Sequence, residues 1–430
     1  MEKAINQHLL KYLEGFNIIS DHQYGFRKSR STGDLLAYVT NLWSNAIEQY
    51  GESRAVALDI SKAFDRVWHE GLLSKLSSYG MSSRFCSWLS SFLKDRSLQV
   101  AVDGYLSDTF TINAGVPQGS ILSPTLFLLY INDLLEKTKN PIYSFADDST
   151  VVSSFTLNAR TSSADAHLRR QLEVSYLNKD LEKILAWGDS NQVEFNAKKT
   201  QAAVFSKKVS ITAPDILMAG NSIQLASSIN LLGVNVGGNM SWHDHVVAIA
   251  KAASQKLGTL FRTKKLYTPQ QLLMLYKAQI RPSLEYCSHV WSSAPKHTLG
   301  LLDSIQKRAV RLIGDPELTN NLESLEHRRR VCDLTLFYRY FHGKCSADIA
   351  SSIPPRAVYG RNTRRTTTSH PYVVQLSTPR TTLFKNSFIW RTSSLWNDLP
   401  EIVFPSEYNL QKFKTNVNRY FRTRTALRAP

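Results

Sequence analysis

Acidic side chains in two separated motifs are the groups best suited to chemistry in this sequence. Asp59 ends a short apolar run, and Asp147 and Asp148 are adjacent much further along the chain. An ionised carboxylate at the edge of a core costs several kcal/mol unless it is paired or metal-bound, and neighbouring carboxylates repel each other unless a cation bridges them. Two Mg²⁺ ions about 3.5–4 Å apart stabilise both the attacking and the leaving oxygen of an in-line displacement. The pattern therefore suits phosphoryl transfer.

A glycine-rich turn, Gly115–Ser120, lies between the two acidic motifs. Glycine permits close backbone approach to a ligand, and the Gln118 amide can both donate and accept hydrogen bonds. Each motif alone has an ordinary structural interpretation. Asp59 can cap the helix that follows it, Gly115–Ser120 can be a bare turn, and aspartates such as Asp147 and Asp148 are common in turns. Their order along the chain favours chemistry over these alternatives.

A small set of strands and helices must bring the motifs together. Residues 55–60 are almost wholly apolar, which predicts a strand buried on both faces, and residues 142–145 and 150–153 predict a hairpin with a tight turn at Asp147-Asp148. The acidic motifs would meet if their strands were neighbours in one sheet. Further short strands are expected at 98–102, 109–113, near 204 and at 229–234. Apolar spacing predicts helices at 32–48, 70–80, 82–94, 126–137 and 165–188, and a nearly all-helical stretch from 242 to 340.

Charge divides the chain into a neutral part and a basic C-terminal part. The 430 residues carry 52 Lys and Arg against 35 Asp and Glu, a net charge of +17. Residues 1–254 hold 24 basic and 24 acidic side chains, so the whole surplus lies in residues 255–430. Lys and Arg release condensed counterions when they bind phosphates, so this distribution favours a nucleic-acid partner. A solvated basic surface is the alternative.

Composition excludes several classes of protein. The hydrophobic fraction of 43% is ordinary, which excludes a disordered or collagen-like chain. Four scattered cysteines do not form a disulfide framework, so a reducing compartment is expected. No apolar run approaches the ~20 residues that span a bilayer, and the start lacks a signal-peptide core. We expect a soluble, intracellular protein without membrane contact, and the sequence does not distinguish nucleus from cytoplasm.

Six motifs together carry a resemblance to a known family. In chain order they are Gln23-Tyr24-Gly25-Phe26-Arg27, Leu58-Asp59-Ile60-Ser61-Lys62-Ala63-Phe64-Asp65, Gly115–Ser120, Phe145-Ala146-Asp147-Asp148, Asn196-Ala197-Lys198-Lys199-Thr200 and Leu231-Leu232-Gly233-Val234. With them, residues 3–240 resemble the reverse transcriptase of animal non-LTR retrotransposons, the LINE type and most closely the jockey-like group. The resemblance implies an RNA-directed DNA polymerase. The implied fold class is α+β, a right-hand polymerase palm with partial fingers, followed by a helical thumb and a basic C-terminal region.

The resemblance implies a role for each residue at the acidic motifs. Asp59 and Asp147 would hold the catalytic Mg²⁺ ions, with the Ile60 carbonyl assisting and Asp148 beside them. Mg²⁺ suits this arrangement because it takes a few carboxylates together with substrate phosphates rather than a complete protein cage.

Five further residues would contact the substrates, if they act as the matching positions of the family do. Phe64 would block a ribose 2′-hydroxyl and so favour deoxynucleotides. Gln118, with Gly119 beside it, would pack near the templating base pair. Lys199 would approach the triphosphate as a candidate proton donor to pyrophosphate, and Arg27 would contact template or nucleotide.

The resemblance also predicts domains and partners. Residues 1–50 are expected to be partial fingers, 51–240 the palm with the remaining finger elements, 241–345 a thumb-like region, and 346–430 a basic region of unknown role. The partners would be an RNA template, a DNA primer and deoxynucleoside triphosphates, and the oligomeric state stays open. Family members usually carry an endonuclease and further finger motifs before the point where this sequence begins, so we expect an N-terminally truncated copy.

Other interpretations remain open at this stage. A truncated copy can be a catalytically inactive remnant that only binds nucleic acid, and an RNA-dependent RNA polymerase would share the acidic hairpin, although Phe64 disfavours it. A zinc site is a minor alternative for four residues of suitable type but unsuitable spacing, His327, Cys332, His342 and Cys345. Four tryptophans can stack on bases but are more often core residues: Trp242, Trp291, Trp390 and Trp396.

Overall fold

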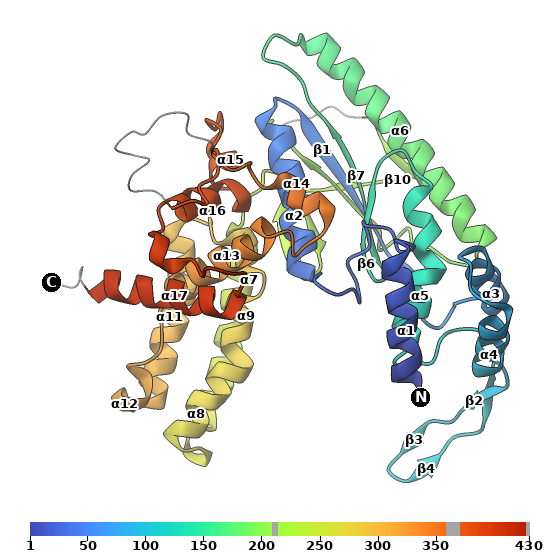
Figure 1. Cartoon of the computed structure of the whole chain (residues 1–430), viewed down its shortest axis with the longest axis horizontal. Helices are drawn as coiled ribbons and strands as arrows, with labels where there is room; N and C mark the ends of the chain where they lie inside the picture. Colours follow the sequence, from blue (N-terminus) through green and yellow to red (C-terminus); the bar gives the residue numbers. More distant parts are fainter. Residues whose placement is uncertain (209–213, 358–369, 427–430) are drawn as a thin grey trace. The chain divides into compact units, whose positions relative to one another are not determined.

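The computed structural model of the chain describes residues 1–208, 214–357 and 370–426. These residues form two compact units (Figure 1). Unit 1 comprises Met1–Ser31, Ser53–Val204 and Lys208–Ala226, and unit 2 comprises Thr32–Glu52, Phe205–Lys207 and Ser227–Pro430. Of the expected C-terminal region 346–430, residues 358–369 and 427–430 lie outside the described ranges. The four-part division into fingers, palm, thumb and C-terminal region stays a prediction.

A five-stranded sheet organises unit 1, with the strand order β11-β8-β1-β7-β6. The strands are β1 (Glu52–Leu58), β6 (Ile142–Phe145), β7 (Asp148–Phe155), β8 (Gln201–Phe205) and β11 (Leu225–Ala226), and a separate hairpin pairs β9 (Ile216–Met218) with β10 (Asn221–Ile223). β1 is buried along almost its whole length, as expected for its apolar part, residues 55–58. It begins three residues earlier than the expected strand at 55–60, with the buried polar residues Glu52, Ser53 and Arg54, and it ends before Asp59 and Ile60. β1 and β7 are neighbours, so the strands that carry the two acidic motifs do lie side by side.

The expected hairpin is present, but its turn is displaced by one residue. Phe145 pairs with Asp148, so the two turn residues are Ala146 and Asp147, and Asp148 is the first residue of β7. Ala146 takes the left-handed φ of 57° that the turn requires. The prediction of a turn at Asp147-Asp148 is therefore wrong by one position.

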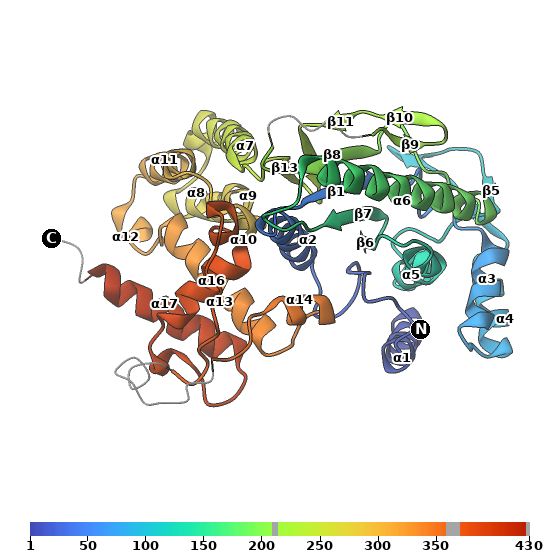
Figure 2. The ribbon, with the colours of Figure 1, turned by 90° about the horizontal axis from the view of Figure 1, so that it is seen from above.

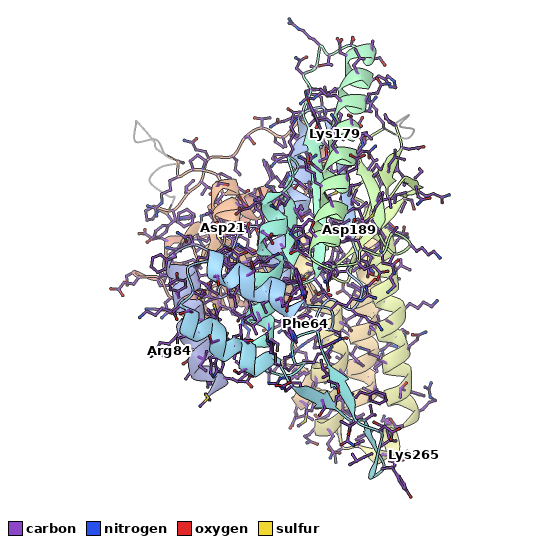
Figure 3. The ribbon with its side chains drawn as sticks, turned by 90° about the vertical axis from the view of Figure 1, so that its right-hand side faces the viewer. Asp21, Phe64, Arg84, Lys179, Asp189 and Lys265 are labelled. Atoms are coloured by element: carbon purple, nitrogen blue, oxygen red, sulfur yellow. The ribbon has the colours of Figure 1, made fainter. Side chains whose placement is uncertain are left out.

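The helices of unit 1 pack on this sheet and enclose its main core. They are α1 (Glu2–Gly15), α3 (His69–Ser78), α4 (Ser83–Leu93), α5 (Ser123–Ile131), the short η1 (Asn132–Glu136) and α6 (Ser163–Ser190). α6 runs along the sheet (Figure 2) and begins at Ser162, whose hydroxyl caps it by accepting from the Asp165 N–H. Its buried residues recur at helical spacing, whereas Lys179 and Asp189 are on its exposed side (Figure 3).

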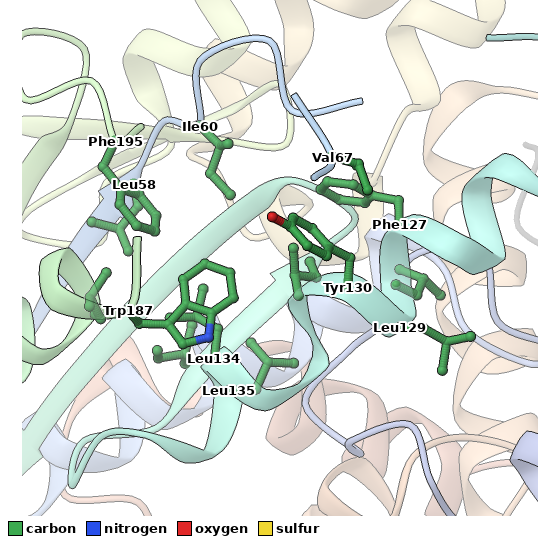
Figure 4. Close-up of a cluster of buried hydrophobic side chains, with 14 of the residues drawn as sticks. Leu58, Ile60, Val67, Phe127, Leu129, Tyr130, Leu134, Leu135, Trp187 and Phe195 are labelled. Atoms are coloured by element: carbon green, nitrogen blue, oxygen red, sulfur yellow. The ribbon is translucent and has the colours of Figure 1, made fainter. Parts of the chain in front are cut away.

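The core joins residues from the strand end, from α5 and from α6. Figure 4 shows Leu58 and Ile60 on one side, Tyr130 and Leu134 in the middle, and Trp187 packed against them. Because Asp59 lies between two of these buried residues, the backbone that carries its carboxylate is anchored by apolar burial on both sides.

A two-stranded ribbon with an apolar surface leaves the body of unit 1 (Figure 1). β2 (Arg96–Leu98) pairs with β5 (Phe110–Ile112), and β3 (Ala101–Val102) pairs with β4 (Tyr105–Leu106). The strand expected at 98–102 is thus split into two short ones.

Unit 2 is mainly helical, in agreement with the pattern over 242–340. Its elements are α2 (Thr32–Glu48), β12 (Ser228–Leu231), β13 (Val234–Gly237), α7 (His243–Arg262), η2 (Lys264–Leu266), α8 (Pro269–Leu275), η3 (Tyr276–Ile280), α9 (Arg281–Glu285), α10 (Ser288–Trp291), α11 (Lys296–Ile313), α12 (Pro316–Thr319), α13 (Leu325–Phe341), α14 (Ala347–Ser352), α15 (Thr382–Lys385), α16 (Phe388–Asn397), η4 (Glu401–Val403) and α17 (Leu410–Ala426). None of the helices in the described residues has the length and apolar character needed to cross a membrane.

Buried polar contacts fix α2 within unit 2. Asp34 is 1% exposed and accepts hydrogen bonds from the Tyr340 hydroxyl, at 2.5 Å, and from the Arg339 guanidinium. His289 Nε2 donates to the Gly33 carbonyl oxygen at 2.9 Å. A buried carboxylate with these partners ties α2 to α13, although 305 residues separate Asp34 from Arg339.

The single strand expected at 229–234 is a hairpin of β12 and β13. Leu231 pairs with Val234, and the two residues between them, Leu232 and Gly233, have positive φ of 49° and 78°. Because Leu232 and Gly233 continue the apolar run, the sequence pattern predicts that the strand continues through them. In the structure they form a two-residue turn in which both φ angles are positive, and this turn ends the strand.

Candidate active site

Three carboxylates from two neighbouring strands meet in one electrostatic site of unit 1. Asp59 directly follows β1, Asp147 is in the β6–β7 turn and Asp148 begins β7. The pKa of Asp148 is raised by desolvation first, then by the negative charges of Asp147 and Asp59. The acidic motifs, far apart in sequence, therefore act on each other through space.

The segment after α6 holds Asp59 from the other side. Ile60 forms an antiparallel bridge with Phe195, and Asn196 N–H donates to the Asp59 carbonyl oxygen at 2.8 Å. The Asn196 side chain accepts from the next turn, which brings Lys199 round so that its Nζ is 3.8 Å from Asp59 Oδ2. Both side chains keep solvent contact, 69% exposed for the lysine and 38% for the aspartate, so this ion pair adds little stability by itself.

Gln23 clamps the acidic turn. Its backbone lies along β6, with a parallel bridge to Ser144 and a 2.8 Å bond from Tyr24 N–H to the Ser144 carbonyl oxygen. Its buried Oε1 accepts from the N–H groups of Ala146, at 3.0 Å, and Gly25, at 2.8 Å, while its Nε2 donates to the Ala146 carbonyl oxygen. The side-chain amide therefore satisfies both polar groups of the residue that precedes Asp147.

Arg27 stabilises the same N-terminal segment. Its Nη1 donates to the Ser20 carbonyl oxygen at 2.7 Å and lies 3.7 Å from Asp21 Oδ1. Burial, together with nearby Arg30, lowers the pKa of Arg27 to about 10. In this structure the guanidinium holds its own segment, and its expected contact with template or nucleotide stays a prediction.

The glycine-rich turn packs against the residues that follow Asp59. Val116 N–H donates to the Phe64 carbonyl oxygen at 2.9 Å, and Gln118 Nε2 donates to Asp65 Oδ1 at 2.9 Å. Gly115 has a φ of 90°, and an added Cβ there would be 2.7 Å from the Asp65 carbonyl oxygen, so this position needs glycine. Hydrogen bonds thus join the motif that contains Asp59 directly to the glycine-rich turn.

The Phe64 ring is held by two other aromatic rings. It stacks on Phe127 of α5 with centroids 4.6 Å apart, and Phe26 meets it edge-on at 6.3 Å. The half-buried Phe64 (Figure 3) therefore has a restricted orientation. Gln118 and Gly119 are exposed nearby on the second motif and remain accessible to a ligand.

Sequence reasoning missed three positioning residues. Gln23 and Asp65 stand inside motifs that were recognised, yet neither received a role, because their partners at positions 146 and 118 are distant in sequence. A third, Glu2, accepts from Ser120 Oγ at 2.7 Å and from Ile121 N–H at 3.0 Å, which lowers its pKa. No sequence pattern pointed to Glu2.

The donor set suits a hard divalent cation. It consists of carboxylates, which Mg²⁺ prefers. The pKa of Asp148 is raised first by desolvation and then by the negative charges of Asp147 and Asp59, and a cation would relieve that repulsion. Asp59 and Asp147, with the Ile60 carbonyl, are the residues that would hold Mg²⁺ together with substrate phosphates. Across residues 1–208, 214–357 and 370–426, no three His, Cys, Asp or Glu side chains form a ready-made metal cluster. A site in which two carboxylates and the oxygens of a substrate bind the ion does not require such a cluster.

The zinc alternative in unit 2 receives no support in the described residues. In the part of the chain that the structure describes, no three of His327, Cys332, His342 and Cys345 come together as a group that could hold a metal ion. His327 instead contacts the Asn418 side chain.

We expect Asp148→Asn to raise the melting temperature at pH 7. A raised pKa in the folded state means that ionised Asp148 destabilises the fold, and the amide removes that charge. The gain over wild type should shrink as the pH falls through the folded pKa, because protonation then relieves the wild-type protein too. Thermal unfolding between pH 7 and pH 4 measures this, with the exposed Asp108→Asn as matched control. A gain independent of pH would contradict the raised pKa of Asp148.

Comparisons with known proteins show what the chain is similar to. A family model described as reverse transcriptase (RNA-dependent DNA polymerase) matches residues 1–236. The chain is 28% identical over 319 residues to the RNA-directed DNA polymerase from mobile element jockey of Drosophila melanogaster, covering 73% of this chain and 34% of that protein. It is also 28% identical over 327 residues to the probable RNA-directed DNA polymerase from transposon BS of the same organism, with the same coverage. The chain thus spans about a third of the length of these curated relatives.

Among solved structures, apo telomerase from Candida tropicalis is similar at 13% sequence identity and a TM-score of 0.37. The similarity covers 82% of this chain and 55% of that one.

Proposed function

The chain belongs to the reverse transcriptase (RNA-dependent DNA polymerase) family, and from this premise we propose that its acidic site extends a primer with deoxynucleotides along an RNA template. The observation that carries the proposal is the electrostatic coupling of Asp59, Asp147 and Asp148 at the ends of two neighbouring strands. The names of the matched relatives, RNA-directed DNA polymerases from a mobile element and a transposon, support the same activity. We assign the chain to a non-LTR retrotransposon, as its motifs indicate.

Asp59 and Asp147 would hold two Mg²⁺ ions with the Ile60 carbonyl, and Asp148 would add negative charge beside them. When bound, these ions supply electrostatic stabilisation to the oxygens that attack and leave the α-phosphorus. The primer 3′-oxygen forms a bond to that phosphorus while the bond from the phosphorus to the pyrophosphate oxygen breaks. Lys199, already beside Asp59, would donate a proton to the leaving pyrophosphate.

The other motif residues would orient the substrates. Phe64, fixed between Phe26 and Phe127, would present its ring to the sugar of the incoming nucleotide. Gln118, tied to Asp65, and the neighbouring Gly119 would pack near the templating base pair. Arg27 would approach template or nucleotide.

In this proposal residues 51–240 act as the palm and 1–50 as part of the fingers. Residues 241–345 act as a thumb, and 346–430 add a basic region. The template is RNA, the primer DNA and the substrates deoxynucleoside triphosphates.

The direct test is incorporation of a labelled deoxynucleotide by the purified chain on primed homopolymer RNA with Mg²⁺. Template-dependent extension is the expected result, and it should require the deoxynucleotide that matches the template. Extension that ignores the template, or none at all under conditions where the chain stays folded, would overturn the proposal.

A second candidate function is nucleic-acid binding without catalysis. The observation that favours it is the charge distribution, because all of the +17 lies in residues 255–430, outside the acidic site. This second function predicts that the chain binds RNA in a salt-sensitive way but incorporates no deoxynucleotide. Measured incorporation by the wild-type chain would therefore show that binding is not its only function.

We expect Phe64→Val to relax sugar selection. The smaller side chain leaves room for a 2′-hydroxyl, so the efficiency of ribonucleotide relative to deoxynucleotide incorporation should rise roughly 10–100-fold. Single-nucleotide extension with both substrates measures the ratio. The control is Phe110→Val, on the exposed ribbon, which should leave it unchanged. An unchanged ratio in Phe64→Val would show that the ring does not face the sugar.

A further inference from the structure

A cavity of about 810 Å³ lies within unit 2, away from the acidic motifs. Its walls come from the start of α11, one side of α13 and the region of α15 and α16 (Figures 1 and 2). This volume is in the range of small-ligand sites. Neither the proposed polymerase chemistry nor the sequence motifs assign it a function.

The charged residues of this cavity are mostly basic. Two of its arginines are neutralised by its acids: Arg391 by Asp333 at 2.5 Å and Arg330 by Glu326 at 2.6 Å. The remaining cations are Lys296, Lys385 and Arg329, against the single carboxylate of Asp303. The cavity therefore keeps a net positive charge.

Arg329 is the unusual member of this set. It is only 4% exposed, lines the cavity, and its buried Nη1 has no hydrogen-bond partner among the described residues. Burial lowers the pKa of Arg329, and the charges of Asp303, Glu326, Asp333 and Glu285 partly offset this, but a guanidinium stays protonated at neutral pH. A buried charge without a hydrogen-bond partner is costly, and an anionic ligand in the cavity would offset that cost. Asp333 Oδ1, also buried without a partner in the described part of the chain, is an acceptor on the same wall, so the ligand must offer a donor as well.

The N-terminus of α11 supplies a second, independent attraction for anions. This 18-residue helix begins at Lys296 on the cavity wall, has no acidic residue in its first turn and has no side-chain cap. The first backbone N–H groups of this helix and its dipole thus favour negative charge in the cavity that Arg329 also lines.

Trp390 adds an aromatic surface to the same wall. Its indole Nε1 donates to the Ser377 carbonyl oxygen at 3.0 Å, which fixes the ring. The other three tryptophans considered for stacking are at most 7% exposed and belong to cores. Trp390 is therefore the tryptophan of that set placed to meet a base.

We propose that this cavity binds one nucleotide unit of a single-stranded nucleic acid. Its phosphodiester meets Arg329, Lys296, Lys385 and the α11 N-terminus, and its base meets Trp390. A lone phosphate would leave most of the 810 Å³ and the indole unused. The whole surplus of positive charge lies in residues 255–430, which favours a polyanionic ligand over a single anion.

The test measures binding of a labelled 12-nucleotide single-stranded RNA to the full chain by fluorescence anisotropy, without Mg²⁺ or nucleotide. The double variant Lys296→Ala/Lys385→Ala should weaken binding roughly tenfold and reduce the salt slope of log K by about 1.4, about 0.7 for each lost phosphate contact. The control Lys412→Ala/Lys414→Ala removes two exposed lysines of α17 and should change the slope little. The assay contains neither Mg²⁺ nor nucleotide and measures binding alone, so failed catalysis does not affect this test.

Two further variants separate the phosphate from the base. Arg329→Met, with melting temperature confirming the fold, should weaken binding like the double lysine variant. Trp390→Leu should weaken it at least about fivefold and Trp390→Phe much less, because stacking needs only an aromatic face. Equal losses for the α17 control and the double variant would overturn the proposal. Competition by inorganic phosphate or poly-glutamate as strong as by unlabelled RNA, at equal ionic strength, would overturn it as well.

Discussion

Asp147→Asn should abolish deoxynucleotide incorporation while leaving the protein folded. The amide keeps the shape of the carboxylate but loses the charge that would hold Mg²⁺. Metal ions supply several kcal/mol of charge stabilisation in phosphoryl transfer, so we expect a fall of roughly a thousandfold or more. Asp59→Asn should do the same, since its carboxylate belongs to the same site. Initial rates on primed homopolymer RNA measure the loss.

The stability of Asp147→Asn distinguishes this explanation from simple damage. Removing one of three repelling charges should leave the melting temperature unchanged or raise it, and should lower the pKa of Asp148 toward its ordinary value. Carboxyl NMR titration reports that shift directly. The matched control is Asp189→Asn, an identical change on the exposed side of α6 (Figure 3), which should keep full activity. Equal activity in the two variants would refute the proposed role of Asp147.

Local sequence patterns predicted the elements that carry the site. The apolar run before Asp59 indicated a buried strand, and β1 ends one residue before it. Helical spacing located α2 at 32–48 and α6 to within two residues at each end. These predictions rest on neighbours in sequence. Burial on one face leaves a periodic pattern of apolar residues, and burial on both faces leaves a continuous apolar run, so both can be recognised without knowing the fold.

Contacts between distant segments left no such signal. Gln23 and Ala146 are 123 residues apart, and nothing in either segment shows that one side chain satisfies the backbone of the other. Leu232 and Gly233 were read as strand because turn geometry depends on φ and not on hydrophobicity. Arg329 looked like one basic residue among many, since its burial without a partner follows from the packing of three helices.

Gly25→Ala should disable the polymerase site from outside it. A Cβ at Gly25 would lie 2.3 Å from the backbone nitrogen of Ala146 and 3.0 Å from its Cα, and neither atom belongs to a flexible side chain. Either the segment of Gln23 separates from β6 or the turn that carries Asp147 moves. A displacement of about 1 Å costs roughly 100-fold in rate, and overpacking costs roughly 1–3 kcal/mol of stability.

Two companion variants test whether the turn, and not general instability, is responsible. Gly15→Ala adds the same methyl group in open space and should leave rate and stability nearly unchanged. Gln23→Met keeps the volume but removes the hydrogen bonds to Ala146, so it should lower kcat with little change in the KM for the nucleotide. If Gly25→Ala and Gln23→Met melt earlier yet extend primers at the wild-type rate below their melting temperatures, the N-terminal segment supports only the fold. A fall in kcat in both, at a temperature where both are folded, means that this segment sets the position of the acidic turn.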